Sequence, residues 1–167
     1  MLLSAFLVED KADIRKALVD AMEEMAPMRF VGQAVDERGA REWLSSNDHR
    51  WELAIVDLFL EEGTGFGVLR DCQKRLPHQK VVVLTSYSQP NILDRCRALG
   101  VDEIFDKSTD VEKLVHFCKC HAADLHDHLA PRISEAPPPT RAESLSAPPD
   151  GRSTPLFTQN SRPVPLQ

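Results

Sequence analysis

The sequence has few of the features that mark secreted, membrane-spanning or nucleic-acid-binding proteins. Its four cysteines form no CxxC pair, which favours a reducing compartment over a disulfide framework. No segment approaches the roughly 18 consecutive apolar residues of a transmembrane helix, and the short apolar run at the N-terminus lacks the basic segment of a signal peptide. The net charge of −6 disfavours a general nucleic-acid surface. We therefore expect a cytoplasmic protein that binds neither nucleic acid nor membrane.

Hydrophobic residues make up 42% of the 167 positions, which is enough for a substantial core. Strand-like apolar runs alternate with segments in which apolar residues recur at helical spacing. The predicted strands are residues 2–8, 28–35, 53–57, 80–85 and 101–106. Five such strands separated by five helices predict an α/β fold with a doubly wound parallel sheet.

Capping residues and prolines predict where the helices begin and end. The third helix is expected over residues 68–76, and the fourth runs from Pro90, which suits a first turn, to a C-cap at Gly100. The predicted N-caps of the first, second and fifth helices are Asp13, Asp36 and either Thr109 or Asp110.

The composition changes near residue 128. Nine of the twelve prolines lie from Pro131 onward, among Ser, Thr, Ala and Arg, and helical periodicity is lost. Such a segment buries too little apolar surface to offset its ordering entropy. We therefore expect a folded domain over residues 1–128 and a disordered proline-rich tail over 129–167. The run Pro137–Pro139 either forms a polyproline II ligand or belongs to a tail without such a role.

Polar residues stand at the carboxyl ends of the predicted strands. Glu9 and Asp10 follow the first strand, Asp57 ends the third, Thr85 ends the fourth, and Lys107 follows the fifth. Open α/β sheets bind their ligands at this edge. If the strands are parallel, three carboxylates, a hydroxyl and an ammonium share a small volume there. Alone, Asp57 is equally consistent with a residue that caps its own loop.

Three neighbouring carboxylates repel one another, and a hard divalent cation removes that conflict. The sequence therefore predicts a Mg²⁺ site formed by Glu9, Asp10 and Asp57, with the backbone carbonyl of Phe59 as a further ligand. Asp57 would then act as a nucleophile toward phosphorus. Lys107 and Thr85 would stabilise negative charge on the transferred phosphoryl group.

The combination resembles the receiver domain of two-component response regulators. The matching motifs are Val8–Asp10, Ile55–Asp57 with Gly65, Val83–Ser86 and Ala98–Lys107, and the resemblance covers about residues 3–125. It implies a flavodoxin-like fold with strand order 2-1-3-4-5. It also implies that Asp57 accepts a phosphoryl group from a histidine kinase or a histidine phosphotransfer protein, with a surface change on helix 4, strand 5 and helix 5.

Several positions depart from the family pattern. Ile104 stands where an aromatic switch residue is common, so its coupling to Thr85 lacks a hydroxyl, and Phe105 is expected to pack in the core because adjacent strand residues face opposite sides. Ser108 replaces the usual proline. Phe59 and Tyr87 either flank the phosphoryl group and slow its hydrolysis, or point outward.

The resemblance implies a signalling switch that is not an enzyme beyond its own phosphorylation and slow dephosphorylation. It signals through an unidentified protein partner, and a homodimer through helices 4 and 5 is compatible with it. The alternatives are a phosphate sink or shuttle in a phosphorelay and a phosphorylation-independent interaction module. A dehalogenase-like phosphatase is disfavoured because it needs a second carboxylate at the position of Phe59.

Other patterns are interpreted as structural. Cys118-Lys-Cys-His121 resembles a metal motif, but residues two apart point to different sides of a helix, so Cys118 is assigned to the apolar face. Trp43 is expected to face the core, and Trp51 is expected to pack at the entry to the third strand. The residues expected to be solvated are the segment 71–75 and the histidines at 116, 121, 126 and 128.

Overall fold

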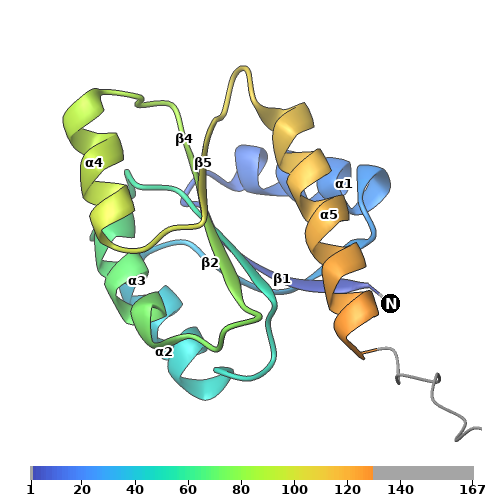
Figure 1. The fold of residues 1–167 in the computed structure, drawn as a ribbon. Coiled ribbons are helices and arrows are strands. Elements are labelled where there is room, and N and C mark those ends of the chain that lie inside the picture. Colours follow the sequence, from blue (N-terminus) through green and yellow to red (C-terminus); the bar gives the residue numbers. More distant parts are fainter. Residues whose placement is uncertain (1, 130–167) are drawn as a thin grey trace, which may run out of the picture. The chain divides into compact units, whose positions relative to one another are not determined.

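The computed structural model describes residues 2–129, and these form a five-stranded parallel sheet with strand order β2-β1-β3-β4-β5 (Figure 1). The strands are β1 (Leu3–Val8), β2 (Met28–Ala34), β3 (Leu53–Val56), β4 (Lys80–Thr85) and β5 (Glu103–Asp106). Both the predicted fold class and the predicted strand order are confirmed. The fifth strand begins two residues later than its apolar pattern indicated.

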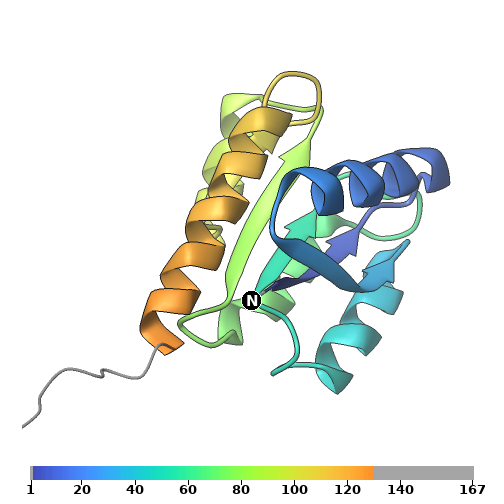
Figure 2. The same cartoon turned by 90° about the vertical axis from the view of Figure 1, so that its right-hand side faces the viewer.

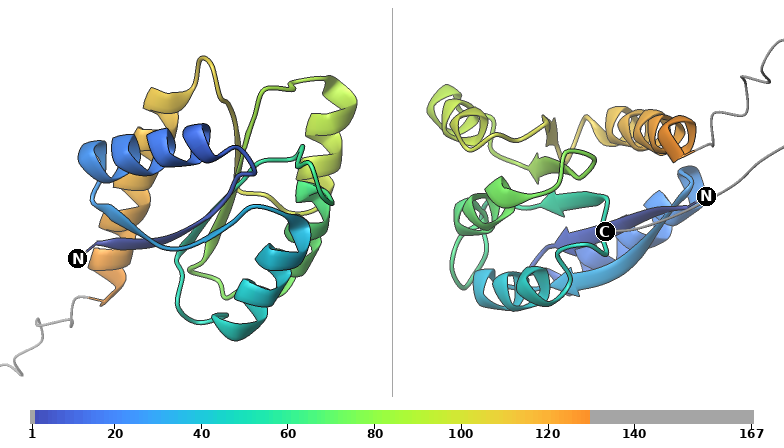
Figure 3. Two further views of the ribbon diagram at one scale, coloured as in Figure 1. Left: turned by 180° about the vertical axis from the view of Figure 1, so that it is seen from behind. Right: turned by 60° about the horizontal axis from the view of Figure 1, so that its bottom comes forward.

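Helices cover both faces of the sheet. They are α1 (Ala12–Met25), α2 (Glu37–Ser46), α3 (Gly65–Asp71), α4 (Pro90–Ala98) and α5 (Val111–Leu129), with a 3₁₀ turn, η1 (Cys72–Lys74), after α3. Helices α1 and α5 pack on one face, and α2, α3 and α4 pack on the other (Figures 1 and 2). Views from behind and from below show the same layers (Figure 3). This arrangement leaves the carboxyl edge of the sheet to the loops.

The core consists of two apolar clusters separated by the sheet. Ala54 and Val56 of β3 belong to the cluster under α2, α3 and α4, whereas Leu53 and Ile55 belong to the cluster under α1 and α5. All four side chains are buried. A strand covered on both faces needs apolar residues on both sides of its pleat, which explains why β3 is a continuous apolar run.

Both tryptophans pack as predicted. The Trp43 ring of α2 stacks on the Phe6 ring of β1, with centroids 4.1 Å apart and planes inclined by 4°. Trp51 is buried just before β3.

Two predicted helix starts are wrong. Asp13 lies inside the first turn of α1, whose N-cap is Lys11. An acidic residue there still interacts favourably with the helix dipole. Helix α3 begins at Gly65 rather than residue 68, because Thr64 caps it through the Gly67 N–H at 3.3 Å. The cap at Asp36 and the first-turn proline at Pro90 agree with the predictions. The C-cap of α4 is Leu99, one residue before the predicted Gly100, which follows it in the left-handed region with a φ of 77°.

Besides Cys72, which is buried in the cluster under α2, α3 and α4, two further residues expected to be solvated are not. His121 of α5 is buried, and its Nε2 lies 3.0 Å from the Glu52 carbonyl oxygen. The Arg75 side chain is 16% exposed and pairs with Asp102 at 3.0 Å. Both residues find partners far away in sequence, which local periodicity cannot reveal.

Helix α5 ends at Leu129, near the predicted boundary, and the predicted tail with Pro137–Pro139 lies outside the described residues. Among the residues described, none of the helices is both long enough and apolar enough to cross a bilayer.

Candidate functional site

The carboxyl edge of the sheet brings Lys107, Asp57 and Glu9 into direct contact. The Lys107 ammonium donates to Asp57 Oδ2 at 2.8 Å and to Glu9 Oε2 at 2.5 Å. The Glu9 and Asp57 side chains are 1% and 9% exposed, and that of Lys107 is 15% exposed. The three residues come from the ends of β1, β3 and β5, as the parallel topology requires. The predicted convergence of these groups is present.

Asp10 completes an acidic cluster that fits a divalent cation. One carboxylate oxygen each from Glu9, Asp10 and Asp57 lie within 4.8 Å of one another. Asp10 Oδ2 accepts from the Glu61 N–H at 3.1 Å, whereas its Oδ1 is buried and has no hydrogen-bond partner among the residues that the structure describes. A buried carboxylate oxygen without a partner costs free energy, which a metal ligand bond would offset. The donor set, oxygen only, is the one that Mg²⁺ and Ca²⁺ prefer.

The loop after β3 places its backbone beside Asp57. The Phe59 N–H donates to Asp57 Oδ1 at 3.4 Å, and the Gly65 N–H donates to the Leu58 carbonyl at 2.9 Å. A Cβ atom on Gly65 would overlap the Asp57 carbonyl, so this position needs glycine. The geometry brings the Phe59 backbone next to the acidic cluster, where its carbonyl was predicted to serve as a ligand.

Thr85 closes the other side of the site. Its side chain is buried at the end of β4, and its hydroxyl accepts from the Tyr87 N–H at 3.2 Å. Its carbonyl accepts from the Lys107 N–H at 3.0 Å, which ties the β4 and β5 ends together. The predicted hydroxyl therefore lies on the strand between those of Asp57 and Lys107.

Burial and hydrogen bonding have opposing effects on the pKa values of Glu9, Asp10 and Lys107. Burial raises the pKa of Glu9 above its ordinary value, and the hydrogen bond from Lys107 offsets only part of that effect. Burial acts to lower the pKa of Lys107, but its bonds to Asp57 and Glu9 outweigh burial, so the pKa is raised. Burial also acts to raise the pKa of Asp10, yet the neighbouring Glu9 carboxyl and the hydrogen bond from the Glu61 N–H bring it below its ordinary value. Lys107 thus remains a cation between the carboxylates.

Phe59 and Tyr87 lie together on the rim of the site. Their ring centroids are 4.3 Å apart, and the two residues are 44% and 50% exposed. Each is two positions beyond a site residue, Asp57 or Thr85. The rings therefore pack against each other and link the loops after β3 and β4.

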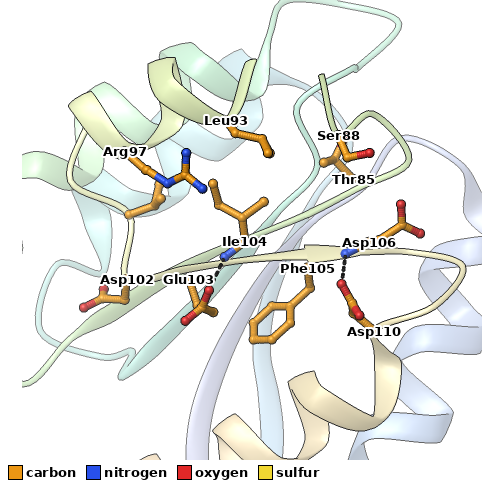
Figure 4. Close-up of a pocket in the computed structure, with 11 residues that line it drawn as sticks. Thr85, Ser88, Leu93, Arg97, Asp102, Glu103, Ile104, Phe105, Asp106 and Asp110 are labelled. Atoms are coloured by element: carbon orange, nitrogen blue, oxygen red, sulfur yellow. Dashed lines mark hydrogen bonds between the residues drawn. The ribbon is translucent and has the colours of Figure 1, made fainter. Parts of the chain in front are cut away.

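Ile104 and Phe105 face opposite sides of β5, as predicted (Figure 4). Phe105 is buried in the cluster under α1 and α5, and its ring packs edge-on to Phe117. Ile104 lies toward α4 in a pocket of about 240 Å³ that Leu93 and Thr85 also line (Figure 4). The pocket connects the vicinity of Thr85 with the surface between α4 and β5.

Sequence reasoning missed Arg15. Its guanidinium donates to the carbonyls of Glu9 and Asp10 at 2.9 and 3.3 Å, and so holds the loop that carries the acid pair. A basic residue one turn into the helix after the acid pair was the available signal. In contrast, the interpretation of Cys118 was correct, since it is buried in the core while Cys120 is exposed.

Comparison with known proteins identifies a family and a shared fold. The family model of the response regulator receiver domain matches residues 5–119. The photosynthetic apparatus regulatory protein RegA of Cereibacter sphaeroides is 29% identical over 113 residues, which are 68% of this chain and 59% of RegA. The chain thus spans about six-tenths of the length of that relative.

Two solved structures share the fold. A LuxR-family DNA-binding response regulator from Staphylococcus aureus is 21% identical, with a TM-score of 0.64 over 72% of this chain and 98% of that one. A response regulator from Burkholderia pseudomallei, solved with a phosphorylated aspartic acid, calcium and citrate, is 19% identical, with a TM-score of 0.60 over 77% and 73% of the two chains.

The family model of the receiver domain covers well over half of the chain. It describes a signalling family rather than a classical enzyme family. Response regulators receive their phosphoryl groups from histidine kinases, and the acidic pocket of receiver domains binds a divalent ion. The chain therefore belongs to the response regulator receiver domains, the phosphorylation-dependent switches of two-component signalling.

Proposed function

We propose that Asp57 is the phosphoacceptor of this receiver domain and that Glu9, Asp10, Asp57 and the Phe59 carbonyl hold Mg²⁺ beside it. The observation that carries the proposal is the contact of the Lys107 ammonium with Asp57 and Glu9 next to the partnerless Asp10 oxygen. This arrangement offers a nucleophile, a fixed positive charge and a cation site within one small volume.

The chain's own residues supply most of the chemistry. A carboxylate oxygen of Asp57 attacks the phosphorus of a phosphohistidine on a histidine kinase or a phosphotransfer protein. A phosphorus–oxygen bond forms, the phosphorus–nitrogen bond breaks, and its electron pair returns to the donor imidazole. The Lys107 ammonium and the Thr85 hydroxyl donate to the phosphoryl oxygens as negative charge gathers there. When bound, the cation neutralises the carboxylates and the incoming phosphoryl oxygens.

The comparisons add support. The Burkholderia pseudomallei relative carries a phosphorylated aspartic acid and a calcium ion, and oxygen ligands suit both Ca²⁺ and Mg²⁺. The name of the Staphylococcus aureus relative calls it DNA-binding. For this chain, signalling through a protein partner, the absence of nucleic-acid binding and a cytoplasmic location stay predictions.

Incubation of the full chain with a small acyl phosphate and Mg²⁺, followed by intact mass measurement, tests the proposal. One phosphate adduct is expected in the wild-type chain and in Asp48→Asn, whose carboxylate is exposed far from the site. No adduct is expected in Asp57→Asn or when the cation is chelated. Phosphorylation that persists in Asp57→Asn would refute the assignment.

We also propose that the paired rings of Phe59 and Tyr87 slow hydrolysis of the phosphoaspartate. They cover the rim next to Asp57 and Thr85, where an attacking water must approach in line with the phosphorus. The half-life is expected to be on the order of hours, and Phe59→Ala together with Tyr87→Ala should shorten it. A wild-type half-life of seconds without a phosphatase would contradict the idea.

A phosphate shuttle is the second candidate, because a long-lived phosphoaspartate suits transfer to another histidine as well as signalling. Mixing the phosphorylated chain with a histidine phosphotransfer protein separates the two. Rapid loss of phosphate to the histidine identifies a shuttle, whereas retention identifies a switch. The interaction-module alternative requires that partner binding be unchanged in Asp57→Asn.

A further inference from the structure

Glu37, the first residue of α2, turns its carboxylate into the loop that follows the phosphoacceptor strand. Its Oε2 accepts from the Thr64 N–H at 2.7 Å and from the Thr64 hydroxyl at 3.4 Å. The Glu37 N–H donates to the Glu62 carbonyl at 3.3 Å. Arg41, one turn along α2, holds the other carboxylate oxygen at 3.2 Å. Glu37 is 21% exposed, so it is a fixed contact between two segments rather than a solvated helix residue.

The loop backbone is shaped around this side chain. Gly63 has a φ of 78°, in the left-handed region that favours glycine. A Cβ atom on Gly63 or on Gly67 would overlap the Glu37 side chain. Two positions without side chains thus leave the room that the carboxylate occupies beneath the start of α3.

The anchored loop is also the loop that completes the acidic site. Thr64 forms an antiparallel bridge with Phe59, whose carbonyl is the proposed fourth ligand. The Glu61 N–H, between them, donates to Asp10 Oδ2. Thr64, which Glu37 holds, is therefore paired directly with Phe59 and lies three residues after Glu61, whose N–H orients Asp10.

From these contacts we infer that Glu37 is a positioning residue for the cation site: its carboxylate fixes residues 59–64 against α2 and so sets the Phe59 carbonyl and the Glu61 N–H. The inference rests on the proposed function of the site. Partners that orient metal ligands commonly contribute about 10–100-fold to metal affinity. Loss of the anchor should leave the three carboxylates in place but let the loop move.

Three Glu37 variants of the full chain test the inference. Glu37→Ala removes the acceptor, Glu37→Asp shortens the side chain so that it no longer reaches Thr64, and Glu37→Gln keeps an amide oxygen for the Thr64 N–H. The matched control is Glu42→Ala, on the same helix, whose carboxylate is 66% exposed and pairs with Arg38 on the helix surface.

Two measurements are made on each variant. Hydrogen exchange without cation reports whether the Glu61 and Thr64 amides open more often, and calorimetric titration with MgCl₂ gives the dissociation constant. We expect faster exchange and a roughly 10-fold weaker affinity for the Ala and Asp variants. The Gln variant and the control should bind Mg²⁺ within about threefold of wild type, and phosphorylation at saturating Mg²⁺ should persist in all.

The result that overturns the inference is wild-type Mg²⁺ affinity in Glu37→Asp or Glu37→Ala together with faster Thr64 exchange, because Glu37 would then only stabilise the start of α3. If Glu37→Ala fails to fold, the Asp and Gln variants carry the comparison. Failure of the wild-type chain to bind Mg²⁺ or to accept phosphate would instead refute the proposed function itself.

Discussion

Asp102 joins three segments at the amino edge of the sheet, opposite Asp57, and its replacement should be strongly destabilising. Its Oδ2 accepts from the Val81 N–H at 2.8 Å and from Arg75 at 3.0 Å, and its Oδ1 pairs with Lys80 at 3.0 Å. The side chains of Asp102, Arg75 and Lys80 are 19%, 16% and 38% exposed. The carboxylate thus links β4, the start of β5 and the turn after α3.

The expected loss of stability follows from the groups that Asp102→Ala leaves without their partner. The Val81 N–H loses its side-chain acceptor, which costs about 1–3 kcal/mol, and Arg75 loses a charge-assisted bond of about 1.5–3 kcal/mol. The Lys80 pair is more exposed and contributes about 0–1 kcal/mol. Arg75 keeps its bonds to the carbonyls of Gly100 and Gln79, so we expect a loss of about 3–4 kcal/mol in the free energy of unfolding.

The sign of the pH dependence is fixed by the pKa of Asp102. Burial acts to raise that pKa, but the Val81 N–H, Lys80 and Arg75 outweigh burial and hold it below its ordinary value. The unfolded chain titrates near pH 3.9. The carboxylate therefore stabilises the fold fully above that pH, and this stabilisation is lost as the pH falls through the lower folded pKa.

Urea unfolding of the wild type, Asp102→Ala and Asp102→Asn at pH 7 and pH 3 measures these effects. At pH 7 the urea midpoint of Asp102→Ala should fall by about 1–2 M with an unchanged m-value. The difference in urea midpoint between wild type and Asp102→Asn should be smaller at pH 3 than at pH 7. Asp48→Asn, with an exposed carboxylate, is the control. An equal difference in midpoint between wild type and Asp102→Asn at both pH values would show that the charge of Asp102 contributes nothing to the free energy of unfolding.

Three further changes test other parts of the structure. Gln79→Ala should lower the free energy of unfolding by about 3 kcal/mol in urea titrations, because the buried amide donates to two backbone carbonyls and accepts from a third residue. A thiol reagent should label only Cys120 in the native chain and all four cysteines in urea. The reason is that Cys72, Cys96 and Cys118 are buried, and burial raises the pKa of the Cys72 and Cys118 thiols to about 12. Labelling of a second thiol in the native chain would contradict the packing. Lys107→Met should cost about 3–5 kcal/mol without cation at pH 7, and Mg²⁺ should raise the melting temperature of this variant more than that of wild type.

The strands and the site residues could be predicted because both follow from local patterns. An apolar run such as Leu53–Val56 indicates a buried strand, and parallel topology then brings the residues after each strand to one edge. The contact of Lys107 with Asp57, 50 residues apart, follows from that rule alone.

The contacts that local patterns could not reveal depend on where helices and turns happen to pack. Arg75 and Asp102 meet across 27 residues, and His121 meets Glu52 across 69. Each looks like an ordinary surface residue in its own segment. Similarly, the role of Thr64 as a cap was hidden because Gly65 and Gly67, in the first turn of α3, have a low helix propensity.

The contact of Lys107 with two carboxylates has a consequence for the electrical balance of the site. Three carboxylates and one ammonium leave two negative charges, which is what one divalent cation cancels. Phosphorylation of Asp57 would replace one carboxylate charge by the nearly double charge of a phosphoryl group, so the loaded site would gain about one uncompensated negative charge. Thr85 ends β4 with a buried hydroxyl that accepts from the Tyr87 N–H, and turning this hydroxyl toward the excess charge as a donor would give up that bond and free the chain at Tyr87.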